Sequence, residues 1–175
     1  MKNILVVVDM QNDFVDGALG SREAVAIVDN VVAKIESFDG DIYVTYDTHF
    51  EDYMDTEEGR NLPVPHCIKD THGWHLNKKV QDVLDKKECI TEVEKYTFGS
   101  TLLPKLIEPD DEMNIELIGL CTDICVVSNA LILKAHFPEA VVSVDPSCCA
   151  GVTPESHNAA ITTMKMCQIK ESKDV

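Results

Sequence analysis

A short run of mostly β-branched apolar residues, 3–8, lies near the start of the chain and ends at Asp9. Its length and composition predict a strand that is buried on both faces, as in a parallel sheet. Similar runs predict strands at 41–46, 89–93, 115–120, 140–144 and 167–169, and helical patterns occur at 21–38, 77–84, 100–107, 122–136 and 153–164. Because strands and helices alternate, the sequence predicts an α/β fold with a mainly parallel, doubly wound sheet and helices on both faces.

The length of 175 residues indicates a single domain, 1–175. Fifteen basic and 31 acidic residues give a net charge of −16, so phosphate backbones and anionic membranes should repel the chain. We therefore expect neither nucleic acid nor membrane as a partner. No apolar run approaches the ~20 residues of a membrane span, and the first residues do not form a signal peptide. We expect a cytoplasmic protein that forms a homo-oligomer.

Seven cysteines are present, an odd number that favours reduced thiols over a disulfide framework. Cys125 lies in GLCTDICV, where a predicted strand gives way to a predicted helix. At a helix start the dipole lowers the pKa of a thiol, and backbone N–H groups can bind an oxyanion. Cys125 is thus either a nucleophile or a small apolar side chain packed against the sheet, and the residues alone favour neither interpretation. Packing better explains Cys89, Cys148, Cys149 and Cys167.

Two charged residues lie at the ends of predicted strands, where an open α/β sheet places its ligand site. Partial desolvation in a cleft would raise the pKa of Asp9 and suit it to proton transfer, although a carboxylate that caps the next turn is an equal alternative. Lys95, in EKYTFGS, could hold a nearby carboxylate and thiolate in their charged forms. A solvated surface lysine is the commoner case, and the residues alone favour it.

A long irregular segment, 47–73, contains a candidate metal site, and segments of this kind are usually functional. Asp47 and His49 are two residues apart, so their side chains face the same side of an extended chain. With His66 and the loop carboxylates Glu57 and Glu58 they offer nitrogen and oxygen donors that suit zinc, iron or manganese. Two alternatives stay open: the absence of a metal, and competition from His72 and His75.

Together these residues resemble the isochorismatase-like cysteine hydrolase superfamily, and within it the nicotinamidase/pyrazinamidase family most closely. The resemblance covers nearly the whole chain. It is carried by VVVDMQNDF around Asp9, DTH at 47–49, PHCIKDTHGW at 65–74, EKYTFGST around Lys95 and GLCTDICV around Cys125. Each motif is weak alone, but the ordered set, with most of its members at the ends of predicted strands, is specific.

The resemblance implies a three-layer α/β/α fold and a catalytic triad of Asp9, Lys95 and Cys125. It also implies a cis peptide bond between Leu120 and Cys121. In the family this bond directs the N–H groups at the positions of Cys121 and Cys125 toward the substrate oxyanion. Most relatives carry a small residue such as alanine at the position of Cys121, so the second thiol is a departure from the pattern.

The resemblance further implies one divalent metal ion, zinc before iron or manganese, held by an Asp-x-His pair, a later His, and a His or Glu between them. Asp47, His49 and His66 match this pattern directly. No histidine lies between residues 49 and 66, so the remaining ligand should be acidic, in order of preference Glu58, Glu57 or Asp55.

The implied activity is the hydrolysis of nicotinamide to nicotinate and ammonia, a reaction of NAD salvage. Phe14 would form one wall of the substrate pocket, but Pro63 stands where the family usually has an aromatic residue. That departure keeps a related amidohydrolase, acting on another small amide or carbamoyl compound, as the alternative. Isochorismatase activity is disfavoured, since it needs no cysteine nucleophile. A non-enzymatic metal-binding or thiol redox protein is the alternative from another class.

Overall fold

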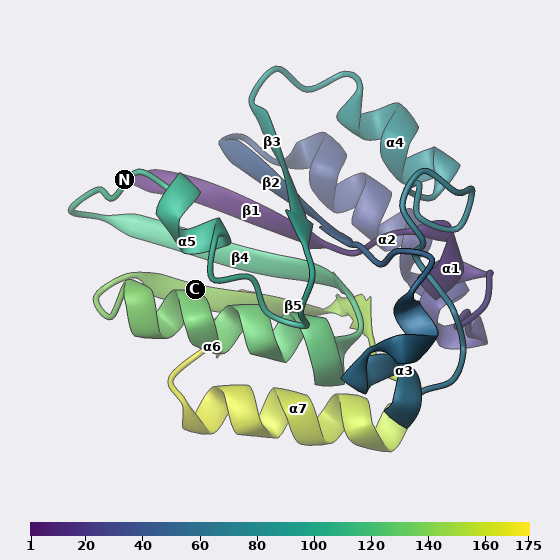
Figure 1. The fold of residues 1–175 in the computed structure, drawn as a ribbon. Helices are drawn as coiled ribbons and strands as arrows, with labels where there is room; N and C mark the ends of the chain where they lie inside the picture. The colour runs from purple at the N-terminus through teal and green to yellow at the C-terminus, as the bar shows by residue number, and fades with distance from the viewer.

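A computed structural model describes all 175 residues and places a six-stranded sheet at the centre of the molecule (Figure 1). The strand order is β3-β2-β1-β4-β5-β6, and every pair of neighbours is parallel. The strands are β1 (Lys2–Val8), β2 (Asp41–Asp47), β3 (Ile90–Lys95), β4 (Met113–Leu120), β5 (Val141–Ala150) and β6 (Lys170–Glu171). The chain builds outward from β1 to one edge and then from β4 to the other, which confirms the doubly wound sheet.

Helices cover both faces of the sheet, so the three-layer α/β/α architecture is also confirmed (Figure 1). One face is covered by α1 (Asn12–Val15), α2 (Arg22–Ser37) and α4 (Lys78–Leu84), and the other by α5 (Leu103–Leu106), α6 (Val127–His136) and α7 (Pro154–Met166). Alternate residues of β1 enter the two cores: Leu5 packs on the α2 side, whereas Ile4 and Val6 pack on the α6 side. None of the helices has the length and apolar character needed to cross a bilayer.

The expected final strand at 167–169 is wrong. These three residues form the C-terminal cap of α7: the N–H of Ile169 donates to the carbonyl of Met164 at 3.0 Å, and Gln168 has a positive φ of 66°. This is the left-handed turn in which many helices end. Pairing with β5 therefore begins only at Lys170, which leaves β6 two residues long.

Three other elements differ from the sequence prediction. The helix expected at 100–107 is only Leu103–Leu106, because the backbone N–H of Ser100 bonds to a side chain of α6. The helix expected at 122–136 begins as a π-helical turn, Thr122–Val126, before α6. The irregular segment 47–73 contains a 3₁₀ turn (Tyr53–Asp55) and α3 (Glu57–Asn61).

The carboxyl ends of four neighbouring strands, β3, β2, β1 and β4, meet at one end of the sheet. Val8 pairs with Thr45 of β2 and with Gly119 of β4, and Asp47 of β2 pairs with Lys95 of β3. Gly119 has a φ of 117°, and a Cβ there would lie 2.1 Å from the carbonyl oxygen of Val8. Only glycine permits this approach, and it brings the turn after β4 against the end of β1.

Candidate active site and metal-ligand cluster

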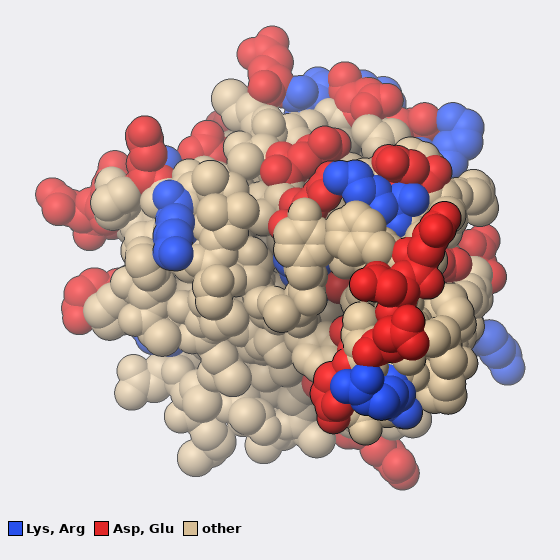
Figure 2. Space-filling view, in the orientation of Figure 1, with Lys and Arg blue, Asp and Glu red and all other residues tan.

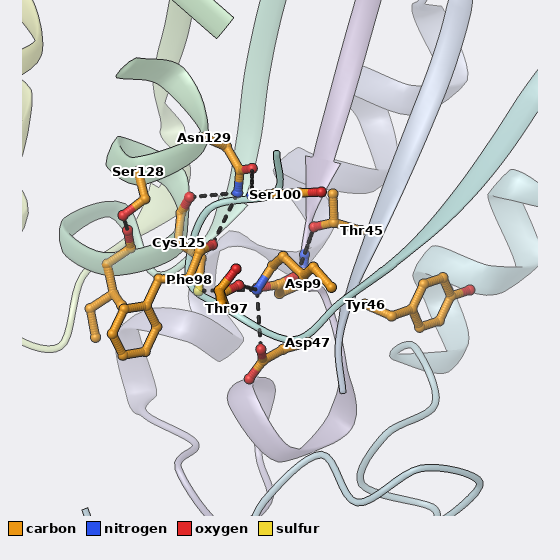
Figure 3. A network of polar contacts seen from close by, with 12 residues as sticks. Asp9, Thr45, Tyr46, Asp47, Thr97, Phe98, Ser100, Cys125, Ser128 and Asn129 are labelled. Carbon is orange, nitrogen blue, oxygen red and sulfur yellow. Dashed lines mark hydrogen bonds and ion pairs between the residues drawn. The ribbon is translucent and has the colours of Figure 1, made fainter. Parts of the chain in front are cut away.

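Asp9, Lys95 and Cys125 come together at this meeting point, and all three are buried. Figure 3 shows the side chains of Asp9 and Cys125 facing the same space. Nζ of Lys95 lies 2.7 Å from Oδ2 of Asp9 and 3.4 Å from Sγ of Cys125. The same ammonium group lies 3.2 Å from Oδ1 of Asp47 and 3.3 Å from the carbonyl oxygen of Thr97. Lys95 is therefore not a solvated surface lysine. It joins the ends of β1 and β2 to the π-helical turn that carries the thiol.

Burial sets the proton affinities of these groups. It raises the pKa of the Asp9 carboxyl, which the positive charge of Lys95 offsets only in part, and it raises the pKa of the Cys125 thiol well above its usual range. The charge of Asp9 raises the thiol pKa further, whereas Lys95 lowers it. Burial would lower the pKa of Lys95, but the surrounding acidic groups, Asp9 first, raise it. The thiol thus keeps its proton in the resting site, beside a carboxyl group of increased proton affinity.

The Asp9 carboxylate does not cap the turn that follows β1. Its Oδ1 accepts a hydrogen bond of 2.6 Å from the hydroxyl of Thr45, and its Oδ2 faces Lys95. Asp9 itself has a positive φ of 48°, a conformation that aspartate tolerates better than most residues. Of the two explanations that the sequence left open, turn capping is not observed, and the buried carboxylate faces Lys95 instead.

The peptide bond between Leu120 and Cys121 is cis, as the resemblance implied. The carbonyl of Cys121 accepts hydrogen bonds from the N–H groups of Ile124 and Val126, at 3.1 and 3.0 Å, which closes the π-helical turn around Cys125. The N–H of Cys121 donates to no group of the chain and is available to a ligand. Burial raises the pKa of the Cys121 thiol to about 12, so this second thiol is protonated at neutral pH.

All seven cysteines are free thiols. Cys148 and Cys149 pack in the two cores, as expected. The expectation that Cys89 and Cys167 are buried is wrong, because Cys89 lies in the turn before β3 and Cys167 at the end of α7, and both are exposed.

Four further side chains converge beside Lys95: Asp47, His49, Glu58 and His66. One ligand atom from each lies within 4.8 Å of the others. Nε2 of His49 lies 3.1 Å from Oδ2 of Asp47 and 3.5 Å from Oε1 of Glu58, and Nε2 of His66 lies 3.5 and 3.6 Å from the same two atoms. Two imidazole nitrogens and two carboxylate oxygens form a donor set that fits zinc, iron or manganese.

Local hydrogen bonds place these donors. The N–H of His49 donates to the carbonyl of Cys67 at 2.9 Å, which holds the loop around His66 beside the end of β2. Nδ1 of His66 donates to the carbonyl of Val64 at 2.8 Å and leaves Nε2 directed at the cluster. Such a second-nitrogen bond is usual for metal-binding histidines. The hydroxyl of Thr56 caps α3 by accepting from the N–H of Gly59, which fixes Glu58 in the first turn.

The other residues considered for this cluster lie elsewhere. Glu57 is exposed and pairs with Arg60 at 2.9 Å, and Asp55 is exposed in the preceding turn. His72 and His75 are exposed and do not join the group. Among the acidic candidates, only Glu58 reaches both histidines. Burial raises its pKa, whereas hydrogen bonds from the two histidines outweigh burial and lower the pKa of Asp47.

A small pocket of about 40 Å³ connects the thiol to the metal-ligand cluster. Phe14 forms one wall of this pocket. Pro63 is exposed and takes no part, and the adjacent Leu62 lines the pocket in its place. The rest of the apolar wall, which was not predicted from the sequence, consists of Leu19, Leu62, Phe98 and Ile124. Phe98 and Ile124 lie within recognised motifs and could have been found there, whereas nothing in the sequence marks Leu19 or Leu62.

The chain is similar in sequence to known proteins. The isochorismatase domain family matches residues 3–172. An uncharacterized isochorismatase family protein, PncA of Bacillus subtilis (strain 168), is 31% identical over 143 residues, or 75% of this chain and 78% of that protein.

Solved structures with the same fold include the nicotinamidase/pyrazinamidase PncA from Bacillus subtilis. Its TM-score is 0.83 at 26% identity, over 98% of this chain and 100% of that chain. The pyrazinamidase of Pyrococcus horikoshii, in complex with zinc, has a TM-score of 0.78 at 27% identity over 98% of both chains.

Proposed function

The chain belongs to the isochorismatase family of hydrolases, and on that premise we propose that it is a metal-dependent cysteine amidohydrolase that converts nicotinamide and water to nicotinate and ammonia. One observation carries the proposal. Lys95 lies between a buried carboxylate and a buried thiol, at the edge of a pocket whose other end is a four-residue metal-ligand cluster. The similar solved structures bear the names nicotinamidase and pyrazinamidase. Ammonia release from nicotinamide by the purified protein is the direct test.

In the first half of the proposed reaction, Asp9 accepts the proton of the Cys125 thiol as sulfur attacks the amide carbon. The increased proton affinity of Asp9 suits it to this role, and Lys95 stabilises the thiolate as it forms. The negative charge that develops on the carbonyl oxygen is bound by the N–H groups of Cys121 and Cys125. Asp9 then gives the proton to the departing nitrogen, and ammonia leaves a thioester on Cys125.

In the second half, a water molecule attacks the thioester carbon and Asp9 accepts its proton. The same two N–H groups stabilise the second oxyanion. Cys125 leaves as a thiolate, takes the proton back from Asp9, and the acid product dissociates. The buried position of the triad excludes bulk water, so the electrostatic contacts of Lys95 act at increased strength.

Asp47, His49, Glu58 and His66 would hold the metal ion, most simply zinc, with iron or manganese as alternatives. When bound, the ion supplies a Lewis-acidic position that a pyridine nitrogen can occupy, which orients the substrate ring in the pocket. Phe14 and Leu62 would lie against the ring.

The charges around the pocket favour a neutral substrate. No lysine or arginine lines it, and the nearby ammonium group of Lys95 already lies against two carboxylates, Asp9 and Asp47. Acidic side chains cover the surface over α3 and beside it (Figure 2). A substrate with free carboxylates, such as an isochorismate, would find no lysine or arginine among the side chains that line the pocket, whereas an uncharged amide needs none.

Nicotinamide should be hydrolysed at least about 10-fold more efficiently in kcat/KM than benzamide, which lacks the ring nitrogen. A single donor contact worth about 1.4 kcal/mol produces that ratio. Parallel ammonia assays on the two amides test this. Equal values would show that the ring nitrogen is not recognised, and would favour a second candidate function.

That second candidate is a related cysteine amidohydrolase acting on another small amide or carbamoyl compound. The aliphatic wall formed by Leu62, together with the exposed position of Pro63, favours it. An aromatic residue at the position of Leu62 would contribute about 0.5–1.5 kcal/mol by stacking on a planar ring, whereas leucine there offers only an aliphatic contact. A non-enzymatic metal-binding or thiol redox protein would release ammonia from neither class of amide.

Lys95→Met should shift the reactivity of Cys125 to higher pH. The lysine charge lies 3.4 Å from Sγ and lowers the pKa of the thiol, so its loss raises that pKa further. We would measure the rate of Cys125 alkylation by iodoacetamide as a function of pH, using peptide mass spectrometry. In Lys95→Met this rate should begin to rise at a higher pH than in the wild type. Mass spectrometry separates this site from the exposed Cys89 and Cys167.

Lys69→Met is the matched control. Lys69 lies in the loop between α3 and α4 and pairs at 2.8 Å with Glu94, the neighbour of Lys95 in β3, but it remains partly exposed. Its alkylation profile should equal that of the wild type. Circular dichroism of Lys95→Met should be recorded alongside, since removal of one member of a buried ion pair typically costs about 3–5 kcal/mol. A folded Lys95→Met with an unshifted profile would remove Lys95 from the activation of the thiol.

A further inference from the structure

Asn129 is a fully buried polar residue that the proposed reaction does not use. It lies in α6, four residues after Cys125, and Figure 3 shows its side chain directed at two separate stretches of backbone. Its Nδ2 donates to the carbonyl of Cys125 at 2.8 Å and to the carbonyl of Phe98 at 3.3 Å, and its Oδ1 accepts from the N–H of Ser100 at 2.9 Å. Both donor hydrogens and the acceptor are therefore engaged.

These partners belong to opposite sides of the active site. One is the carbonyl of Cys125 itself, in the π-helical turn. The others belong to the loop that follows β3; this loop begins directly after Lys95, the last residue of the strand, and contains the pocket residue Phe98. The loop also bonds the lysine directly, through the carbonyl of Thr97 at 3.3 Å from Nζ. A single amide group thus joins the backbone of the thiol-bearing turn to the loop that holds the lysine.

The loop lies closely on α6 along this line. A Cβ at Gly99 would meet Cδ1 of Ile132 at 2.5 Å and Cβ of Ser128 at 3.1 Å, so there is no space between loop and helix. The loop lacks a strand partner here, and Asn129 provides two of its hydrogen bonds to α6. Without the amide, the carbonyl of Phe98 and the N–H of Ser100 would be buried and unpaired, or the loop would move away to reach water.

We propose that Asn129 is a positioning residue that sets the separation of Lys95 from the Cys125 thiol by clamping the loop after β3 to the π-helical turn. The amide touches neither substrate nor reacting atoms and acts through the backbone of both segments. A displacement of about 1 Å in a catalytic group can lower the rate about 100-fold, so the clamp has a direct kinetic consequence.

Asn129→Leu is the first test. Leucine has nearly the same shape as asparagine but forms none of its three hydrogen bonds. The variant should lower kcat for nicotinamide about 10- to 100-fold while KM changes by less than about threefold. A substrate-independent readout accompanies it: the alkylation of Cys125 should rise at higher pH, as Lys95 is no longer held at 3.4 Å. The charged groups around this thiol are Asp9 from β1, Asp47 from β2 and Lys95 from β3.

Asn129→Ser is the second variant, and its smaller side chain fits the buried position without steric overlap. A serine hydroxyl can bond the carbonyl four residues earlier, here that of Cys125, but it does not span to the loop. Clamping predicts that this variant loses kcat and shifts its alkylation profile as Asn129→Leu does. If satisfying the Cys125 carbonyl were the whole role of Asn129, Asn129→Ser would equal the wild type in both measurements, and that result would overturn the proposal.

Ser128→Ala is the control from the same helical turn. The hydroxyl of Ser128 donates to the carbonyl of Ile124 at 2.6 Å and does not bond the loop, so kcat should stay within about twofold of the wild type. The kinetic arm rests on the proposed function, whereas the alkylation arm does not. Absence of nicotinamide hydrolysis by the wild type would sink the proposed function only. Wild-type alkylation profiles in both folded Asn129 variants would sink the clamp.

Discussion

Cys125→Ala is expected to lower ammonia release from nicotinamide by at least about a thousand-fold, because loss of a catalytic nucleophile removes the covalent route and leaves only binding and the oxyanion site. The fold should persist, since the side chain loses one small group from a packed core. A steady-state ammonia assay measures the loss, and near-ultraviolet circular dichroism verifies the fold. Full turnover in this variant would show that another group attacks the substrate.

Cys121→Ala is the matched control, because Cys121 is the only other thiol that lines the pocket. Its backbone N–H, the proposed oxyanion donor, is unchanged by the substitution. Burial raises the pKa of both thiols, but Nζ of Lys95 lies 3.4 Å from the sulfur of Cys125 and 2.7 Å from Asp9, so Cys125 and not Cys121 is placed for activation. The variant should therefore keep activity within a few-fold of the wild type. If Cys121→Ala and not Cys125→Ala lost activity, the two thiols would exchange roles.

The sequence predicted the fold and the position of the site for a physical reason. Parallel strands place their carboxyl ends at one edge, so residues that close separate strands, such as Asp9 and Lys95, meet there although they are far apart in the chain. The order of the short motifs along the chain, through the family resemblance, suggested a role for each of these residues. The motifs favoured Glu58 over Glu57 as the fourth metal ligand but gave no geometric reason. The capped first turn of α3 provides that reason, because it directs Glu58 toward His49.

Other parts of the site depend on packing between distant segments, which periodicity does not encode. Asn129 looks like an ordinary polar residue of an amphipathic helix, and only the folded chain shows that its amide joins the π-helical turn to the loop after β3. Leu62 is similarly unmarked, because the loop's path decides whether it or Pro63 faces the pocket. The end of a helix depends on local residues, yet the strand expected at 167–169 was wrong. The left-handed backbone conformation of Gln168 makes this segment the C-terminal cap of α7.

His49→Ala is expected to bring bound metal close to zero. Two imidazole nitrogens and two carboxylate oxygens converge here, and removal of one nitrogen leaves a weaker, largely anionic set. Loss of an outer-shell partner alone costs 10–100-fold in metal affinity, so loss of a ligand should exceed about 100-fold. Elemental analysis after dialysis gives the metal content. The melting temperature should also stop responding to added zinc, because an ion that binds only the folded state stabilises it.

Two pairs of variants separate this site from general effects on the loop. His72→Ala removes an exposed histidine of the same region and should retain the metal, and Glu57→Gln should retain it while Glu58→Gln loses it. The pairs are matched in chemistry and differ only in whether the side chain reaches the cluster. Full metal content in His49→Ala, or none in the wild type, would contradict the site. Loss in Glu57→Gln but not in Glu58→Gln would keep the site and exchange its fourth ligand, which would require α3 to turn its other side toward His66.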